Sequence, residues 1–287
     1  MSNLRIINKS FIIQNMNTTI AQQNTNSIKP ANLATWLLSH GITTVTADEC
    51  AHLLGVADNE VSQRLKRYRD RGQFVSLARG LWGVVSPEYR EMGAPEPISY
   101  IDQLMKYSGC EYCIGWLSAA ALQGASHQAP QVFQIATAKN MVDRTVGRNS
   151  LQFHTRSYVS HICKKRINTP QGAADVAVPG AVMLMAVSDI LVCGGIDNAA
   201  TIIAELAEEN PSYMNEVLAC VHLFPLSAAR RLGWILEHVA EEDGLEGLAV
   251  FCKQNDNPAM LSPYETRRGR IDSRWNIIIN REIEADI

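Results

Sequence analysis

The stretch from Thr46 to Val85 constrains the fold of this chain most, because its turn and cap residues stand at fixed offsets from its apolar residues. Thr46 and Glu49 form the pattern of a capping box, in which each side chain bonds the other residue's amide, so a helix is expected to begin there. Gly55 ends that helix, since glycine adopts a left-handed backbone without strain. Asp58 is expected to cap a second helix. Two short helices around a tight turn are typical of a helix-turn-helix.

The second helix is expected to have an apolar face and a polar face. Val61, Leu65 and Tyr68 fall at i, i+4 and i+7, which places them on one side, packed inward. The remaining positions carry side chains that can bond base edges or phosphates from the major groove. With one arginine that follows the helix, we predict these DNA-binding residues: Asn59, Ser62, Gln63, Arg64, Lys66, Arg67, Arg69 and Arg79.

Two short strands are predicted after this helix, at residues 74–77 and 81–85. They flank Ala78-Arg79-Gly80 and would form a wing with Arg79 at its tip. The whole stretch therefore predicts a winged helix-turn-helix, which inserts its second helix into the major groove. The alternative is an ordinary helical hairpin with a solvated basic face.

The region before this motif divides into a tail and a helix. Residues 1–29 are rich in Asn, Gln, Thr and Ser and are predicted to be a disordered polar tail, with Met16 as an alternative translation start. Pro30 suits the first turn of a helix that runs to Ser39. The winged helix-turn-helix DNA-binding domain is therefore assigned to residues 30–90, with glycine and prolines in 88–97 as the linker.

Residues 91–287 are predicted to form a larger mixed α/β domain, which makes the whole chain α+β. Residues 112–125, rich in alanine after Trp116, are expected to be helical, and residues 143–149 a basic loop. Alternating apolar and polar residues predict strands at 131–137 and 151–155, and two further strands are predicted at 162–167 and 174–178, around the turn residues 169–172. Later segments are predicted to be a helical cluster at 181–193, 198–209, 212–222, 226–241 and 244–253, and a last strand at 274–280.

Composition narrows the class of protein. The chain has 287 residues, enough for two domains, and a net charge of −3, so its positive charge is local and not that of a nucleic-acid coat protein. Its seven cysteines are scattered, and no secretory signal is evident, which favours a reducing cytoplasm. The most apolar run, residues 176–192, is broken by Pro179-Gly180 and contains Asp189, so it predicts a buried helix and not a membrane span.

Basic residues outside the motif suggest a second positive surface. We predict that this second basic face, which would attract an acidic partner or nucleic acid, consists of Arg144, Arg148, Arg156, Lys164, Lys165 and Arg166. A solvated rim is the alternative. Further along, Arg267, Arg268 and Arg270 indicate a charged turn, with a spacing that can also hold a phosphate.

The sequence gives little support for a metal site or a catalytic site. Cys110 and Cys113 have zinc-ligand spacing and could be completed by His161 and Cys163, but H-x-C is an unusual second half, and two buried free cysteines are the preferred interpretation. A nucleophile would be Ser118 or Cys163, with a histidine base chosen from His127, His154 and His161. No nucleophile elbow or glycine-rich phosphate loop accompanies them. We therefore assign no catalytic residue, metal or cofactor, and expect the chain not to be an enzyme.

The chain resembles the AbiEi family, the antitoxins and transcriptional regulators of type IV toxin–antitoxin systems. Four stretches carry the resemblance: RGLWGVVSPEY, YCIGWLSAAALQGASHQAPQVFQIAT, LQFHTRS and RRGRIDSRWNIIIN. It implies a DNA-binding autorepressor that also counteracts a nucleotidyltransferase-like toxin, without catalysis of its own. One recognition helix covers few base pairs, so we expect a monomer or weak dimer that binds operator repeats cooperatively. The alternatives are a ligand-sensing repressor and an enzyme domain tethered to a DNA-binding module.

Overall fold

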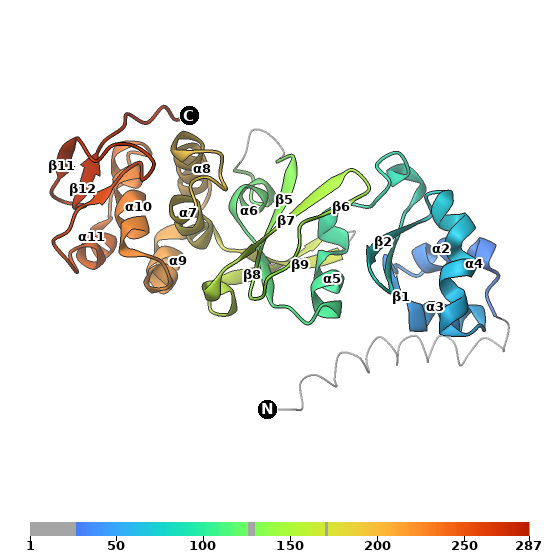
Figure 1. Cartoon of the computed structure of the whole chain (residues 1–287). Coiled ribbons are helices and arrows are strands. Elements are labelled where there is room, and N and C mark those ends of the chain that lie inside the picture. The colour runs from blue at the N-terminus through green and yellow to red at the C-terminus, as the bar shows by residue number, and fades with distance from the viewer. Residues whose placement is uncertain (1–26, 126–129, 170–171, 287) are drawn as a thin grey trace, which may run out of the picture.

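The computed structural model describes residues 27–125, 130–169 and 172–286. The chain has the mixed α+β architecture that its sequence predicts. Figure 1 shows three parts in a row: an N-terminal module of helices and a small sheet, a central sheet, and a helical cluster with a last small sheet. The C-terminal parts of the chain therefore lie far from the N-terminal helices.

The N-terminal module packs helices against a three-stranded antiparallel sheet of order β1-β3-β2. Its elements are α2 (Pro30–Ser39), β1 (Thr44–Thr46), α3 (Ala47–Leu54), α4 (Asp58–Asp70), β2 (Phe74–Ala78) and β3 (Leu81–Val84). Leu33, Leu37 and Leu65 are fully buried between these elements and form the centre of a separate apolar core. The three helices and the two later strands follow the predicted order, whereas β1 was not predicted.

The start of α3 confirms the predicted capping box. The Thr46 amide donates to Glu49 Oε2 at 2.8 Å, and the Glu49 amide donates to Thr46 Oγ1 at 3.3 Å. Gly55 ends the helix with φ +65°, in the left-handed region where a side chain would be strained. The prediction for Asp58 was wrong: Ala57 is the N-cap of α4 and makes no side-chain cap bond. Asp58 instead lies in the first turn, where its negative charge complements the helix dipole.

The predicted tail and linker are partly ordered. The predicted tail falls mostly on residues 1–26, which lie outside the described residues; at its end, the Ile28 amide donates to the Leu53 carbonyl at 2.8 Å. The linker contains two short 3₁₀ helices, η1 (Pro87–Tyr89) and η2 (Pro97–Ser99), and Ala94 between them is buried. This segment is therefore packed against the protein.

The central sheet has six strands in the order β6-β7-β5-β4-β9-β8. They are β4 (Tyr112–Ile114), β5 (Val132–Thr137), β6 (Arg144–Val146), β7 (Asn149–Thr155), β8 (Lys164–Thr169) and β9 (Gly172–Ala177). β5 pairs parallel with β7, and β4 pairs parallel with β9, whereas the other neighbours are antiparallel. Helices α5 (Ile101–Tyr107) and α6 (Trp116–Leu122) contact this sheet, and η3 (Ser157–Ser160) follows β7.

Two predictions for this part need correction. Residues 112–125 were predicted as one helix, but their first three residues are strand β4, and the helix begins only after Gly115. Residues 143–149 were predicted as a loop, but they contain edge strand β6 and the tight turn to β7. In both cases the segment is too short for periodicity to separate a strand from its surroundings.

The C-terminal helices surround α7 (Pro179–Ser188), which is buried on nearly all sides. Around it lie α8 (Ile196–Glu209), α9 (Tyr213–Cys220), η4 (Val221–Leu223), α10 (Leu226–His238) and α11 (Glu246–Cys252), followed by a small sheet of β10 (Ala259–Met260), β11 (Arg270–Asp272) and β12 (Ile277–Ile279). The predicted buried helix in the most apolar run is thereby confirmed. Across the described ranges, no helix is long and apolar enough to cross a membrane.

Candidate nucleic-acid interface

Helix α4 presents the polar face that the sequence predicts. Val61 and Leu65 are fully buried on the side that faces α2 and α3. The predicted DNA-binding residues on this helix are exposed, apart from one that is half-buried; the exposed ones are Asn59, Ser62, Gln63, Arg64, Lys66 and Arg67. A helix of 13 residues is about 20 Å long, which suits a major groove.

Two arginines of α4 are held by contacts within the helix. Arg64 Nη2 lies 3.3 Å from Glu60 Oε2, an exposed ion pair one turn apart. Arg69 is the half-buried residue, and its Nη2 donates to the Ser62 carbonyl at 3.3 Å. The side chains of Lys66 and Arg67 form no hydrogen bond or ion pair with any described residue, so their charges are available to a ligand.

The predicted wing is docked onto the rest of the chain. Tyr107 Oη donates to the Arg79 carbonyl at 2.9 Å, and Arg144 Nη1 donates to the Leu77 carbonyl at 2.6 Å. The side chains of Leu77 and Leu81 are buried in the larger apolar core, which the central sheet and the C-terminal helices form, and not in the core of the N-terminal module. The side chain of Arg79 is nevertheless exposed, so its backbone is fixed while its guanidinium faces outward.

The predicted linker completes this docking. The Arg148 amide donates to the Met92 carbonyl at 2.8 Å, and Asn149 Nδ2 donates to the Pro95 carbonyl at 2.8 Å. Gly147 is needed at this contact, because a Cβ there would lie 2.4 Å from the Met92 oxygen. These residues join the linker to the β6–β7 turn. They carry no local sequence signal for such a contact, because their partners lie far away in the chain.

The predicted second basic face is largely engaged in contacts within the chain. Arg156 forms a two-pronged ion pair with Asp189, at 2.9 and 2.8 Å, and its guanidinium lies over the ring of Trp116, 5.7 Å from its centroid. Arg144 lies over the ring of Phe153 while it bonds the wing. These two side chains therefore hold the fold together and offer little free charge.

The lysine–arginine run on β8 has acidic partners as well. Arg166 Nη2 lies 2.7 Å from Asp102 Oδ2, and Lys164 Nζ lies 3.7 Å from Asp175 Oδ2. Burial alone raises the pKa of Asp102, but hydrogen bonds from Arg166 and Lys106 outweigh it and hold that pKa below its usual value. β8 is an edge strand, and charged side chains on an edge prevent pairing with another chain. Of the predicted face, only Arg148 and Lys165 remain exposed without such a partner.

Two of the alternative catalytic residues, Ser118 and His154, make structural contacts. Ser118 is buried, and its Oγ accepts from the Gln134 amide at 2.9 Å and donates to the Val132 carbonyl at 3.3 Å. His154 packs edge-on against Trp116, with ring centroids 4.8 Å apart. His127 lies outside the described residues.

The alternative zinc ligands do not come together. Cys113 is fully buried, and burial raises the pKa of its thiol to about 12, whereas His161 is exposed. In the part of the chain that the structure describes, no group of three or more His, Cys, Asp or Glu residues could hold a metal ion. All seven cysteines are free thiols, six of them buried.

A comparison with known families found a match for the part of the chain that follows the N-terminal module. Residues 113–238 match the family model of the AbiEi antitoxin C-terminal domain. These residues, somewhat less than half of the chain, are similar to the AbiEi antitoxin family. The match begins in β4 and ends in α10, so it covers the central sheet and most of the helical cluster. It confirms the resemblance and indicates the antitoxin role, which implies a toxin as partner.

The architecture is also similar to that of a solved protein. The crystal structure of RV2827C protein from Mycobacterium tuberculosis matches this chain with a TM-score of 0.64, over 89% of this chain and 92% of that one. Sequence identity is 14%, so the likeness concerns the fold alone. A comparison with curated proteins found no match.

Proposed function

We propose that this antitoxin is also a DNA-binding autorepressor, and that it counteracts a nucleotidyltransferase-like toxin in the cytoplasm without catalysis of its own. The observation that carries the DNA-binding part is the exposed polar face of α4, in which Lys66 and Arg67 are free of acidic partners. The family supports the antitoxin part.

On DNA, the N-terminal module would act as a winged helix-turn-helix. α4 would enter the major groove with Gln63 and Lys66 at base edges, because amide and ammonium groups match the hydrogen-bonding pattern there. Arg67 would bind a phosphate, which positions the protein without distinguishing sequences. Arg79 would reach the backbone or an adjacent groove from a wing whose main chain is held in place.

Specific repression requires more than one copy of the protein. A single helix contacts few base pairs, so we propose that a monomer or weak dimer occupies operator repeats cooperatively. The docked linker supports this arrangement, since it fixes the position of each bound α4 relative to the antitoxin domain. Neighbouring copies would then meet in one defined orientation.

The first experiment is a gel shift on the DNA immediately upstream of the gene, with scrambled DNA as competitor. Gln63→Ala and Lys66→Ala should each weaken specific binding by roughly 1–3 kcal/mol. Arg67→Ala should weaken binding to both DNAs and reduce the salt dependence. Arg90→Ala is the matched control, because Arg90 is exposed and its side chain has no described partner. If the three α4 variants bind operator DNA as the wild type does, α4 is not the DNA-binding element.

Antitoxicity should be tested in the full-length chain. Removing residues 1–90 would also remove Leu77 and Leu81 from the larger core, so a truncated protein would not report on binding alone. The triple variant Gln63→Ala/Lys66→Ala/Arg67→Ala keeps the core intact and is expected to lose repression but still to rescue growth from the co-expressed toxin. Loss of rescue at an unchanged protein level would show that neutralisation acts through DNA.

A further inference from the structure

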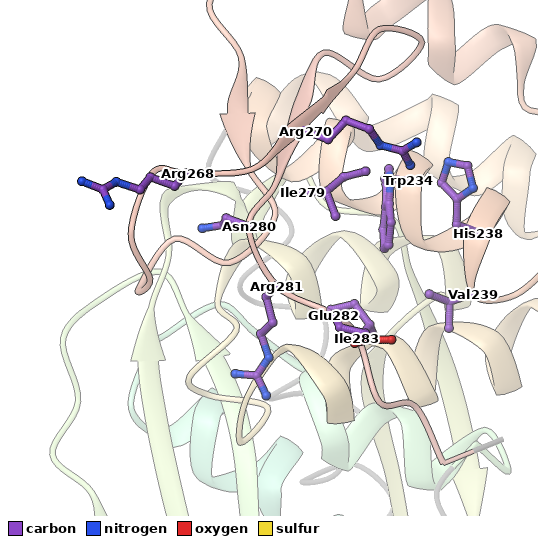
Figure 2. Close-up of a pocket in the computed structure, with 10 residues that line it drawn as sticks. All are labelled: Trp234, His238, Val239, Arg268, Arg270, Ile279, Asn280, Arg281, Glu282 and Ile283. Atoms are coloured by element: carbon purple, nitrogen blue, oxygen red, sulfur yellow. The ribbon is translucent and has the colours of Figure 1, made fainter.

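Two thiols, Cys163 and Cys220, lie together where the central sheet meets the helical cluster. The charged groups of the depression beside the end of α10, which has a volume of about 500 Å³, do not come together in this way. Arg268 and Arg270 in its lining point to opposite sides (Figure 2). The thiol pair is therefore the better candidate for chemistry outside DNA binding.

The two cysteines flank a tightly packed junction at the start of α7. Cys163 stands directly before β8, and its carbonyl accepts from the Val178 amide at 3.1 Å, one residue before α7 begins. Cys220 is the last residue of α9, which packs on the same end of α7. There, the Gly180 amide donates to Glu216 Oε2 at 2.9 Å, and a Cβ at Gly180 would lie 2.6 Å from backbone atoms of α9.

The sulfur of Cys220 is in direct contact with Cys163. Its hydrogen-bonding neighbours include both the thiol and the backbone amide of Cys163. It also donates to the Glu216 carbonyl at 3.1 Å, which fixes its position at the end of α9. A disulfide bond requires sulfur atoms about 2.05 Å apart. Thiols that are already in contact reach that distance through small rotations of their side chains.

The two thiols differ in their access to solvent. Cys163 is half-buried, and the exposed Lys165 lies two residues further along the chain. Cys220 is fully buried, and burial raises the pKa of its thiol to about 12, so it stays protonated at neutral pH. A soluble reagent therefore reaches Cys163 first, and the nearby lysine attracts reagents of negative charge.

We propose that Cys163 and Cys220 are a redox-sensitive pair, which small disulfides of the glutathione class convert into a disulfide bond between the central sheet and α9. A reducing compartment keeps both residues as thiols, and the bond forms when such disulfides accumulate. The proposal goes beyond DNA binding and toxin neutralisation and does not depend on either.

The reaction consists of two exchanges. First, the Cys163 thiolate attacks one sulfur of glutathione disulfide; the glutathione S–S bond breaks, one glutathione leaves, and a mixed disulfide forms at Cys163. Next, Cys220 releases its proton to water and its sulfur attacks Cys163 Sγ, which expels the second glutathione. Two protein thiols are thereby oxidised by two electrons. One glutathione disulfide is reduced to two glutathione molecules, which take up the two protons.

The bond would close a loop that contains β8, β9, α7 and α8. A crosslink across a loop of this length restricts the unfolded chain and so favours the folded one. The oxidised protein is expected to unfold at a temperature roughly 5–15 °C higher than the reduced protein, and dithiothreitol should reverse the shift.

Thiol mapping of the full-length protein tests the proposal. The protein is incubated with an excess of glutathione disulfide and quenched with acid, and its remaining thiols are alkylated in denaturant before mass spectrometry of the peptides. The expected product is a crosslinked peptide pair that contains Cys163 and Cys220, with the other cysteines alkylated. Thermal unfolding of the same sample, followed by circular dichroism, measures the shift.

Single substitutions separate the two steps. Cys220→Ala should stop at the mixed disulfide, with one glutathione on Cys163. Cys163→Ala should carry no glutathione at Cys220, because that thiol is buried. Cys110→Ser is the matched control, since it removes a different thiol of the same domain and should form the crosslink as the wild type does.

Three results would overturn the proposal. In the first, both thiols of the wild type remain alkylated after the incubation, which would show that Cys163 is not reached. In the second, the wild type keeps glutathione on Cys163 as Cys220→Ala does, which would show that the two sulfurs do not meet. In the third, the crosslink joins a different pair of cysteines.

Discussion

Arg144 provides the most direct test of whether the wing is fixed to the antitoxin domain. Its Nη1 donates to the Leu77 carbonyl at 2.6 Å, and its guanidinium also lies over the Phe153 ring. Arg144→Ala removes both contacts and leaves the Leu77 oxygen without this donor. A hydrogen bond from a charged group contributes about 1.5–3 kcal/mol, and the partial exposure of Arg144 reduces this to about 1–2 kcal/mol.

The expected effect is local. A loss of 1–2 kcal/mol, roughly, corresponds to a 5–30-fold increase in the population of the open state. Hydrogen exchange of the wing, residues 74–85, should accelerate by about that factor, whereas α7 should exchange as in the wild type. Mass spectrometry of peptides from the two regions measures both in one experiment.

Arg148→Ala is the matched control for this experiment. Arg148 lies in the same β6–β7 turn, but it reaches Met92 through its backbone amide, which the substitution keeps. Its variant should therefore exchange like the wild type. If the two variants are indistinguishable in the wing, the contact between Arg144 and Leu77 does not hold the wing, and the docking described above is wrong.

Two further predictions concern the body of the protein. Because the pKa of Asp102 is lowered in the folded state, its contribution to stability is present above its unfolded pKa and is lost as the pH falls through the folded pKa. Arg166→Gln should raise the pKa of folded Asp102 and move acid unfolding, followed by circular dichroism, to higher pH. Lys165→Gln is the control and should unfold at the same pH as the wild type. Gly233→Ala would place a Cβ 2.1 Å from Trp275 Cζ3 and should cost about 1–3 kcal/mol in denaturant unfolding, whereas Gly247→Ala meets only the end of the Leu218 side chain and should be nearly neutral.

Local sequence signals predicted local structure well. The capping box of Thr46 and Glu49, the left-handed turn at Gly55 and the inward face of α4 each depend on residues within one or two helical turns. The strands at β5 and β7 followed from alternation alone. The short strands β4 and β6 were missed, because three residues are too few to show a period.

Contacts between distant segments could not be predicted in this way. Nothing in the sequence around Tyr107 or Arg144 indicates that each bonds a wing carbonyl, because the pairs are separated by 28 and 67 positions. The ion pairs within the second basic face could not be predicted for the same reason. Arg156 and Arg166 are basic in composition, but their carboxylate partners come from α5 and from the end of α7.

The availability of an arginine is therefore decided by whether the fold brings a carboxylate to it. The chain has 26 basic and 29 acidic residues, so most positive charges can find a partner in a compact fold. Where a basic residue has such a carboxylate partner, as Arg156 does, the ion pair holds two elements together and its charge attracts few external ligands. The exposed side chains of Lys66 and Arg67, and those of Arg268 and Arg270, are left without one at opposite ends of the molecule. Ligands of negative charge should accordingly be sought at these two places before any other basic run of the sequence.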